Sequence, residues 1–239
     1  DAYYDEHSEQ FHIIFEDLNQ EYKPAPDKTP PTARHREHLM DTLAILHAYW
    51  WEHPLLEELE TMPTEESLNK LLESYQAKLA EIKKSVGSYL DPKYLNILGK
   101  IASNLPSKRH ERLLSAKGLT IIHNNLAPEN VVYSTRETRI VNWQHWGIGI
   151  STDDLAMMIP FNWSPALRQF QEKQLLKRYF DTLQQHKVTG YSWEDFEYDY
   201  KASLAYVIGN MLLQWTRDEH TRGHWRVMEN AMDSLIDMK

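Results

Sequence analysis

The chain has no cysteine among its 239 residues. This absence excludes disulfide bonds, thiolate-bound metals and cysteine nucleophiles. It suits a reducing compartment, and we expect a cytoplasmic protein.

Long apolar runs are also missing. The two most apolar stretches, 155–161 and 205–213, are shorter than the roughly 18 residues that a membrane-spanning helix requires. Residues 1–5 carry neither the basic nor the apolar region of a signal peptide, and they include no initiator methionine. We therefore expect no membrane partner, and we expect the chain to start within a longer protein.

Glycine is scarce, with 8 residues in all. The sequence contains no G-x-G-x-x-G fingerprint, no Walker A motif and no G-x-S-x-G elbow. Dinucleotide-binding folds, P-loop enzymes and serine hydrolases of the α/β type are therefore not indicated.

Basic residues are outnumbered by acidic ones, which gives a net charge of −9. An acidic surface repels nucleic acids and anionic lipids, so we expect no nucleic-acid partner. The densest basic cluster, Lys108-Arg109-His110 with Arg112, is short, and we interpret it as the solvated end of a helix. The negative net charge would suit a cationic substrate.

Helix-forming sequence is plentiful. Apolar residues recur at helical spacing, and Ser, Thr or Asp precede several of these runs as N-cap residues. Helices are predicted at 32–51, 64–87, 91–106, 164–187, 192–215 and 225–238. Short β-rich runs are predicted at 11–15, 119–122, 131–133 and 139–141. The pattern predicts an α+β fold that is mainly α, in which a small β insert interrupts a helical body.

The β insert carries a constellation of polar residues. His123, Asn125 and Asn130 follow its first strand, Asn142 follows its last strand, and Asp154 opens the next helix. This order resembles the aminoglycoside phosphotransferase and choline kinase group of the protein-kinase-like superfamily. The catalytic loop of that group reads His-Gly-Asp, four variable residues, then Asn, and a metal-binding Asp follows about a dozen residues later.

Two earlier segments agree with this resemblance. Residues 15–18 are similar to the last N-lobe strand and the hinge of such kinases, and residues 43–48 are similar to the first helix of their C-lobe. We therefore expect residues 1–18 to form the end of an N-lobe strand and the hinge. Residues 19–239 are expected to form a kinase-like C-terminal lobe, with the rest of the N-lobe absent from this chain.

The resemblance implies transfer of the γ-phosphoryl group of ATP to a hydroxyl of a small substrate, with Mg²⁺. It places Asn125 at the position of the catalytic aspartate, and Asn130 and Asn142 at the metal positions. The remaining implied roles are bracing of the loop by His123 and Asp154, and an adenine-side hinge formed by Glu16, Asp17 and Leu18.

Asparagine replaces aspartate at two of these positions, the catalytic position 125 and the metal position 142. An amide orients a hydroxyl but cannot accept its proton, and loss of a general base costs about 10²–10⁴ in rate. Mg²⁺ usually binds at least one carboxylate, which Glu129, Asp153 or Asp17 would have to supply. The alternative hypothesis is a pseudokinase that acts as a binding or scaffolding module. The two asparagines have two explanations. Either they are native to a pseudokinase, or they replace the aspartates of a parental sequence.

Other residues have simpler interpretations. His47 is expected to face the catalytic loop as a structural histidine, and Asn124, where the group has glycine, is expected to adopt a left-handed backbone. The acidic and aromatic run 193–200 is interpreted as the start of an amphipathic helix with a solvated acidic face. His220 and His224 have the spacing of zinc ligands on a helix, but no third ligand accompanies them.

Overall fold

The computed structural model describes residues 2–24, 32–59, 64–215 and 221–238. Helices dominate it, and the strands form three small antiparallel sheets, so the predicted α+β, mainly α class is confirmed. The helices are α1 (Ala33–Tyr49), α2 (Leu56–Leu59), α3 (Glu65–Val86), α4 (Pro92–Leu114), α5 (Thr152–Asn162), α6 (Pro165–Gln185), α7 (Trp193–Gln214) and α8 (Thr221–Asp237). The strands are β1 (Ala2–Asp5), β2 (Gln10–Ile13), β3 (Lys23–Pro24), β4 (Leu119–Ile122), β5 (Val131–Tyr133), β6 (Thr138–Ile140) and β7 (Gly147–Ile150).

The helices begin where the N-cap residues predicted them. A side-chain oxygen accepts a hydrogen bond from a first-turn backbone N–H at the start of five of them, which satisfies a donor that the helix leaves unpaired. The capping residues are Thr32, Thr64, Asp91, Ser164 and Ser192. At Ser192 the full reciprocal capping box with Asp195 is present.

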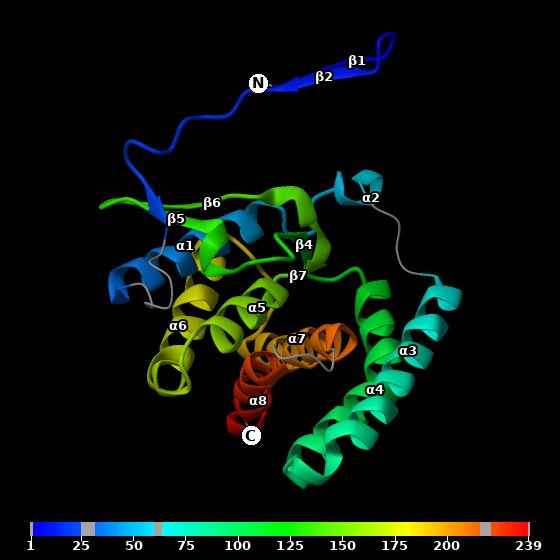
Figure 1. The fold of residues 1–239 in the computed structure, drawn as a ribbon. Coiled ribbons are helices and arrows are strands. Elements are labelled where there is room, and N and C mark those ends of the chain that lie inside the picture. Colours follow the sequence, from blue (N-terminus) through cyan, green and yellow to red (C-terminus); the bar gives the residue numbers. More distant parts are fainter. Residues whose placement is uncertain (1, 25–31, 60–63, 216–220, 239) are drawn as a thin grey trace.

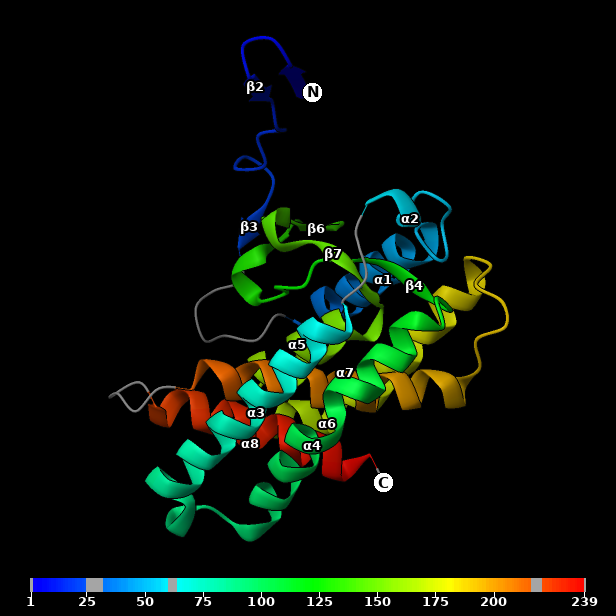
Figure 2. The same cartoon turned by 90° about the vertical axis from the view of Figure 1, so that its right-hand side faces the viewer.

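The helical body has two apolar cores. The first lies between α1, α5, α6 and α7, where α1 packs on α6 and α5 packs on α7. The second joins the long α3–α4 hairpin to α7 and α8. In Figure 1 this hairpin extends along one side of the body, and after a quarter turn it lies in front of α7 (Figure 2). Helix α7 contributes to both cores and so connects the two halves.

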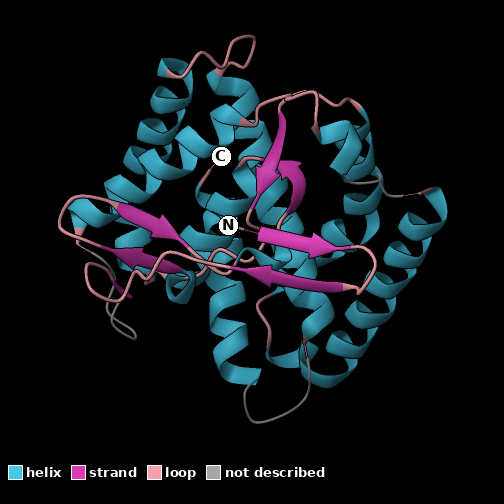
Figure 3. Cartoon of the chain, turned by 90° about the horizontal axis from the view of Figure 1, so that it is seen from above, coloured by secondary structure: helices cyan, strands magenta, loops and turns pink. Residues whose placement is uncertain are grey.

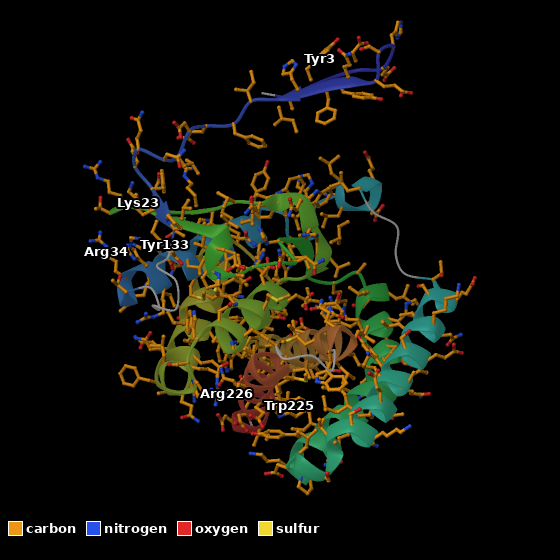
Figure 4. All side chains as sticks on the ribbon, viewed as in Figure 1. Tyr3, Lys23, Arg34, Tyr133, Trp225 and Arg226 are labelled. Atoms are coloured by element: carbon orange, nitrogen blue, oxygen red, sulfur yellow. The ribbon has the colours of Figure 1, made fainter. Side chains whose placement is uncertain are left out.

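The strands lie on one side of the helical body (Figure 3). β4 pairs with β7, and β3, β5 and β6 form a second sheet in which Lys23 is opposite Tyr133. These two residues lie close together in Figure 4. The third sheet is the β1–β2 hairpin, which stands clear of the body, with Tyr3 at 59% exposure. Among the residues described, no helix has the length and apolarity to cross a membrane.

Several details differ from the sequence-based prediction; helix α8, for example, begins at Thr221 and not near residue 225. Helix α4 does not stop near Pro106 but continues through it to Leu114. Proline removes only one intrahelical hydrogen bond, and Leu105, Pro106 and Leu113 are all buried, so packing holds the helix together across the break. The strand predicted at 11–15 occupies Gln10–Ile13 and pairs with Ala2–Asp5.

Candidate active site

The loop that follows β4 is held by one buried carboxylate. Asp154, in the first turn of α5, accepts hydrogen bonds from the backbone N–H of His123 at 2.7 Å and of Asn124 at 2.9 Å. Asp154 is fully buried, and hydrogen bonds to a charged acceptor are stronger than those between neutral groups. The geometry therefore fixes the backbone at the start of the loop.

His47 completes the environment of Asp154. Its Nε2 lies 3.3 Å from Asp154 Oδ2, and its Nδ1 lies 2.6 Å from the hydroxyl of Tyr179. Both ring nitrogens are thus engaged inside the core, since His47 is fully buried. His47 faces the loop as the sequence predicted, through the carboxylate that holds the loop.

His123 connects the loop to the end of β6. Its Nε2 is 2.8 Å from the carbonyl oxygen of Val141, and a carbonyl only accepts, so this nitrogen carries the proton. Nδ1 is then free to accept from the backbone N–H of Asn125, at 3.3 Å. The edge of the Trp143 ring system packs against the imidazole, with ring centroids 4.9 Å apart.

Asn125, Asn130 and Asn142, the three asparagines at the predicted catalytic and metal positions, lie close together. Asn130 Nδ2 donates to the backbone carbonyl of Asn125 at 2.8 Å, and Asn142 Nδ2 donates to Asn130 Oδ1 at 2.7 Å. Asn130 is buried, Asn125 is half-buried and Asn142 is exposed, so the cluster lies at the surface of the fold. Asn124 and Asn142 both have a left-handed backbone, with φ of 60° and 62°, which asparagine adopts more readily than most residues.

This cluster contains amide side chains and no carboxylate. The one amide oxygen that Asn130 could offer to a cation already accepts from Asn142. Within the described chain, no group of three or more His, Cys, Asp or Glu side chains is placed to hold a metal ion. Mg²⁺ usually binds through one or two carboxylates, so the residues present at 125, 130 and 142 do not fit it.

The proposed substitute carboxylates do not change this result. Asp153 forms two hydrogen bonds with the guanidinium of Arg109, at 2.9 and 2.5 Å, and also accepts from Ser203 Oγ and the N–H of Ile150. Asp17 accepts from the backbone and side chain of Asn19. In the described chain, neither Asp17 nor Glu129 forms a hydrogen bond with the asparagine cluster.

The predicted hinge lies apart from the cluster. Glu16 and Asp17 are exposed and Leu18 is half-buried, and the carbonyl of Leu18 accepts from the N–H of Tyr22 in a turn, at 2.9 Å. No hydrogen bond joins these three residues to Asn125, Asn130 or Asn142 in the part of the chain that the structure describes. The adenine-side role of residues 16–18 stays a prediction.

The interpretation of the basic cluster on α4 as solvated is wrong for Arg109 and Arg112, whereas Lys108 is exposed. Arg109 pairs with Asp153, and Arg112 forms two hydrogen bonds with Asp199, at 2.8 and 2.7 Å. Burial alone would lower the pKa of both guanidinium groups, but the facing carboxylates outweigh it and raise the pKa. The signal available in the sequence was the i, i+3 spacing, which puts both arginines on one helix face.

The acidic run 193–200 also differs in part from its interpretation. Asp195 is exposed and caps α7, whereas Asp199 is buried against Arg112 and accepts from the hydroxyl of Tyr191 at 2.9 Å. The face of α7 that carries Asp199 is therefore neutralised inside the protein. His220 lies outside the described residues, as does the side chain of His224.

A cleft of about 1020 Å³ opens beside the loop that follows β4, between α2, α3, the end of α4 and the β4–β7 sheet. Asn124 lines it, and so does Trp146, which is 43% exposed. Most of its other walls are apolar. The apolar lining residues are Pro54, Leu56, Leu68, Leu71, Leu113, Leu119, Ile122, Ile148 and Tyr206.

Comparisons with known proteins concern the family and the fold of the chain. The model of the ecdysteroid kinase-like family matches residues 1–189. A choline kinase from Cryptosporidium parvum Iowa II is 12% identical with a TM-score of 0.52, over 90% of this chain and 69% of the kinase. A Plasmodium vivax ethanolamine kinase is 14% identical with a TM-score of 0.51, over 89% of this chain and 62% of the kinase.

At these identities the two solved structures show the fold alone. They confirm the predicted resemblance in fold to the choline kinase group. Among curated proteins, a sequence search finds no match to this chain.

Proposed function

Because the chain belongs to the ecdysteroid kinase-like family, we propose that it is an ATP-dependent phosphotransferase whose acceptor is a hydroxyl of a small molecule. The observation that carries this proposal is the bracing of the loop by Asp154. It holds Asn124 at the wall of a large cleft and Asn125 directly after it. Phosphoryl transfer depends mainly on positioning, and this arrangement positions an acceptor.

The residues of this chain support some parts of the reaction better than others. We assign to Asn125 the orientation of the acceptor hydroxyl, because its amide can hydrogen-bond that group. It cannot take the proton, so we expect transfer to be slower by about 10²–10⁴ than with a carboxylate there. Mg²⁺ would ordinarily neutralise the phosphates of ATP, but Asn130 and Asn142 do not fit it, and we assign them no step.

The lining of the cleft supports a largely apolar acceptor. Its charged members are Glu52, Glu57, Arg109 and Lys117. The carboxylate of Glu52 is already engaged by the backbone N–H of Gly118 at 2.7 Å, and Arg109 is paired with Asp153. A polycation such as an aminoglycoside would meet one further carboxylate, Glu57, beside two cationic side chains. A hydroxylated compound of steroid size suits an apolar cavity of this volume, in keeping with the name of the family, and we place the reaction in the cytoplasm.

A second candidate function is binding without transfer, in a pseudokinase. The hydrogen bond between Asn142 and Asn130 favours it, because the two amides satisfy each other without a cation. In this case the cleft binds the same acceptor, and the protein acts as a carrier or scaffold.

One experiment tests the proposal on the unmodified protein. The chain is incubated with Mg²⁺-ATP and a panel consisting of a polyhydroxylated steroid, choline and an aminoglycoside, and phosphorylated product is sought by mass spectrometry. We expect slow formation of the steroid phosphate only, together with saturable steroid binding by calorimetry. Binding without product supports the pseudokinase, and absence of both binding and product contradicts the two functions together.

A further inference from the structure

A second cavity, of about 670 Å³, lies along α4; it shares Arg109 with the cleft, and its other lining residues are different. Helix α4 forms one wall over most of its length, from Lys93 to Arg112, and α7, α8 and Ile150 of β7 form the rest. Its floor is apolar. The apolar lining residues are Ile97, Ile101, Leu105, Ile150, Ala202, Ala205, Leu235 and Ile236.

All the charged residues that line this groove are cationic. None of the residues that line it is acidic, although acidic residues outnumber basic ones in the whole chain, 35 to 26. The lining cations Lys93, Arg109 and Arg112 already pair with carboxylates. The other three, Lys100, Lys108 and Lys201, have no carboxylate within 4 Å in the described chain.

The free lysines surround the apolar floor from two helices. Lys100 and Lys108 are exposed on α4, and Lys201 is half-buried on the facing helix α7. An unpaired cation beside an apolar surface attracts an anion, and the groove has this local excess of cations on a protein of net charge −9. The surface therefore complements a ligand that is apolar along its body and negative at one end.

The length of the groove suits a ligand of this kind. From Lys93 to Arg112 the α4 wall covers about 28 Å at 1.5 Å per residue. An extended hydrocarbon chain can lie along the apolar floor over part of this length, and its terminal anion would then meet the unpaired lysines.

We propose that this groove binds a free single-chain fatty carboxylate, with the alkyl chain along α4 and the carboxylate near Lys108 and Lys201. The groove shares only Arg109 with the acceptor cleft, and this proposal does not depend on phosphoryl transfer.

The test is calorimetric titration of the whole chain with dodecanoate below its micelle concentration, with dodecanol as the uncharged counterpart. We expect saturable binding of dodecanoate and binding of dodecanol weaker by about tenfold or more. The variant Ala202→Phe fills the floor, and Lys108→Glu with Lys201→Glu reverses the rim. Each is expected to raise the Kd by about tenfold or more.

Lys173→Glu is the matched control, because it reverses an exposed lysine of α6 away from the groove; its Kd should stay within about twofold of the parent. Thermal melting of each variant without ligand reports whether the fold is kept. If Ala202→Phe melts early, the double lysine variant carries the test. Equal affinity in parent and rim variant overturns the proposal, as does binding to vesicles of anionic phospholipid without binding to dodecanoate.

Discussion

Asn142 donates a hydrogen bond through its side-chain amide to the amide oxygen of Asn130, at 2.7 Å. Asn130 in turn donates to the backbone carbonyl of Asn125. Hydrogen bonds therefore link the three positions that the resemblance connects with phosphoryl transfer. The side chains at these positions are neutral amides, and the side-chain oxygen of Asn130 accepts a hydrogen bond where a cation would otherwise bind.

Replacing Asn142 with aspartate should create a cation site. A carboxylate at 142 removes the donor to Asn130 and brings two oxygen atoms to about 2.7 Å, where they repel unless a cation lies between them. We expect the melting temperature of Asn142→Asp to rise with millimolar Mg²⁺, because a ligand that binds only the folded state stabilises it. Asn69→Asp adds the same charge on an exposed face of α3 and should not respond. An identical response in both variants, or none in either, contradicts this account.

Asp154 should matter for stability as well as for the loop. Asp154→Ala leaves the backbone N–H groups of His123 and Asn124 without their acceptor inside the protein. We expect a loss of about 3 kcal/mol in the free energy of unfolding, measured with urea. Asp41→Ala breaks an exposed pair with Arg178 and should cost less than about 1 kcal/mol. Similar losses in the two variants would show that Asp154 is not a special brace.

The sequence predicted the helices and the order of the loop residues because both depend on local patterns. N-cap residues such as Thr64 and Ser192 mark their helices directly, and the spacing of His123, Asn125 and Asn130 is readable from the chain. Strand β7 was missed because Gly147 and Gly149 weaken any β signal. Position 149 has no room for a side chain, since a Cβ there would lie 2.5 Å from Ile122 Cδ1.

Partners distant in sequence could not be predicted. Arg109 and Asp153 are 44 residues apart, and Arg112 and Asp199 are 87 apart. A charge run on a helix is equally compatible with solvent and with buried carboxylates. Only the tertiary packing that brings Asp153 of α5 and Asp199 of α7 against α4 selects between them. The lining of the cleft could not be predicted for the same reason. Its residues come from helices and strands that are far apart in the sequence.

The start of α7 should respond to acid through Asp195. The backbone N–H of Ser192 and then its hydroxyl lower the pKa of Asp195 below the ordinary value of 3.8. A carboxyl whose pKa is lowered by folding stabilises the protein above its ordinary pKa, and this contribution disappears as the pH falls through the folded value.

Ser192→Ala removes the hydroxyl, so the variant should be less stable at pH 7 by about 1 kcal/mol. The difference from the parent should narrow as the pH falls below about 4, which urea unfolding between pH 7 and pH 3 measures. A difference that does not change with pH contradicts the role of Asp195.

Trp146 should contribute to binding of the acceptor. It lines the cleft with an exposed indole, which can stack on a flat apolar ligand. Trp146→Ala is expected to raise the Kd of the bound hydroxysteroid by about tenfold, measured by calorimetry, with little change in melting temperature. Leu114→Ala truncates an exposed apolar residue that does not line the cleft and serves as the control. Equal effects of the two changes would place the ligand elsewhere.

The most direct test of the account is the rate of phosphoryl transfer in the double variant Asn125→Asp, Asn142→Asp, measured as kcat/KM with Mg²⁺-ATP and the hydroxyl compound that the cleft binds, in the full-length protein. We predict a rise of about 10²-fold or more over the parent, because the variant regains a proton acceptor at 125 and an anionic cation ligand at 142. An unchanged rate, with acceptor binding intact, would contradict the assignment of these two positions to the chemistry of transfer.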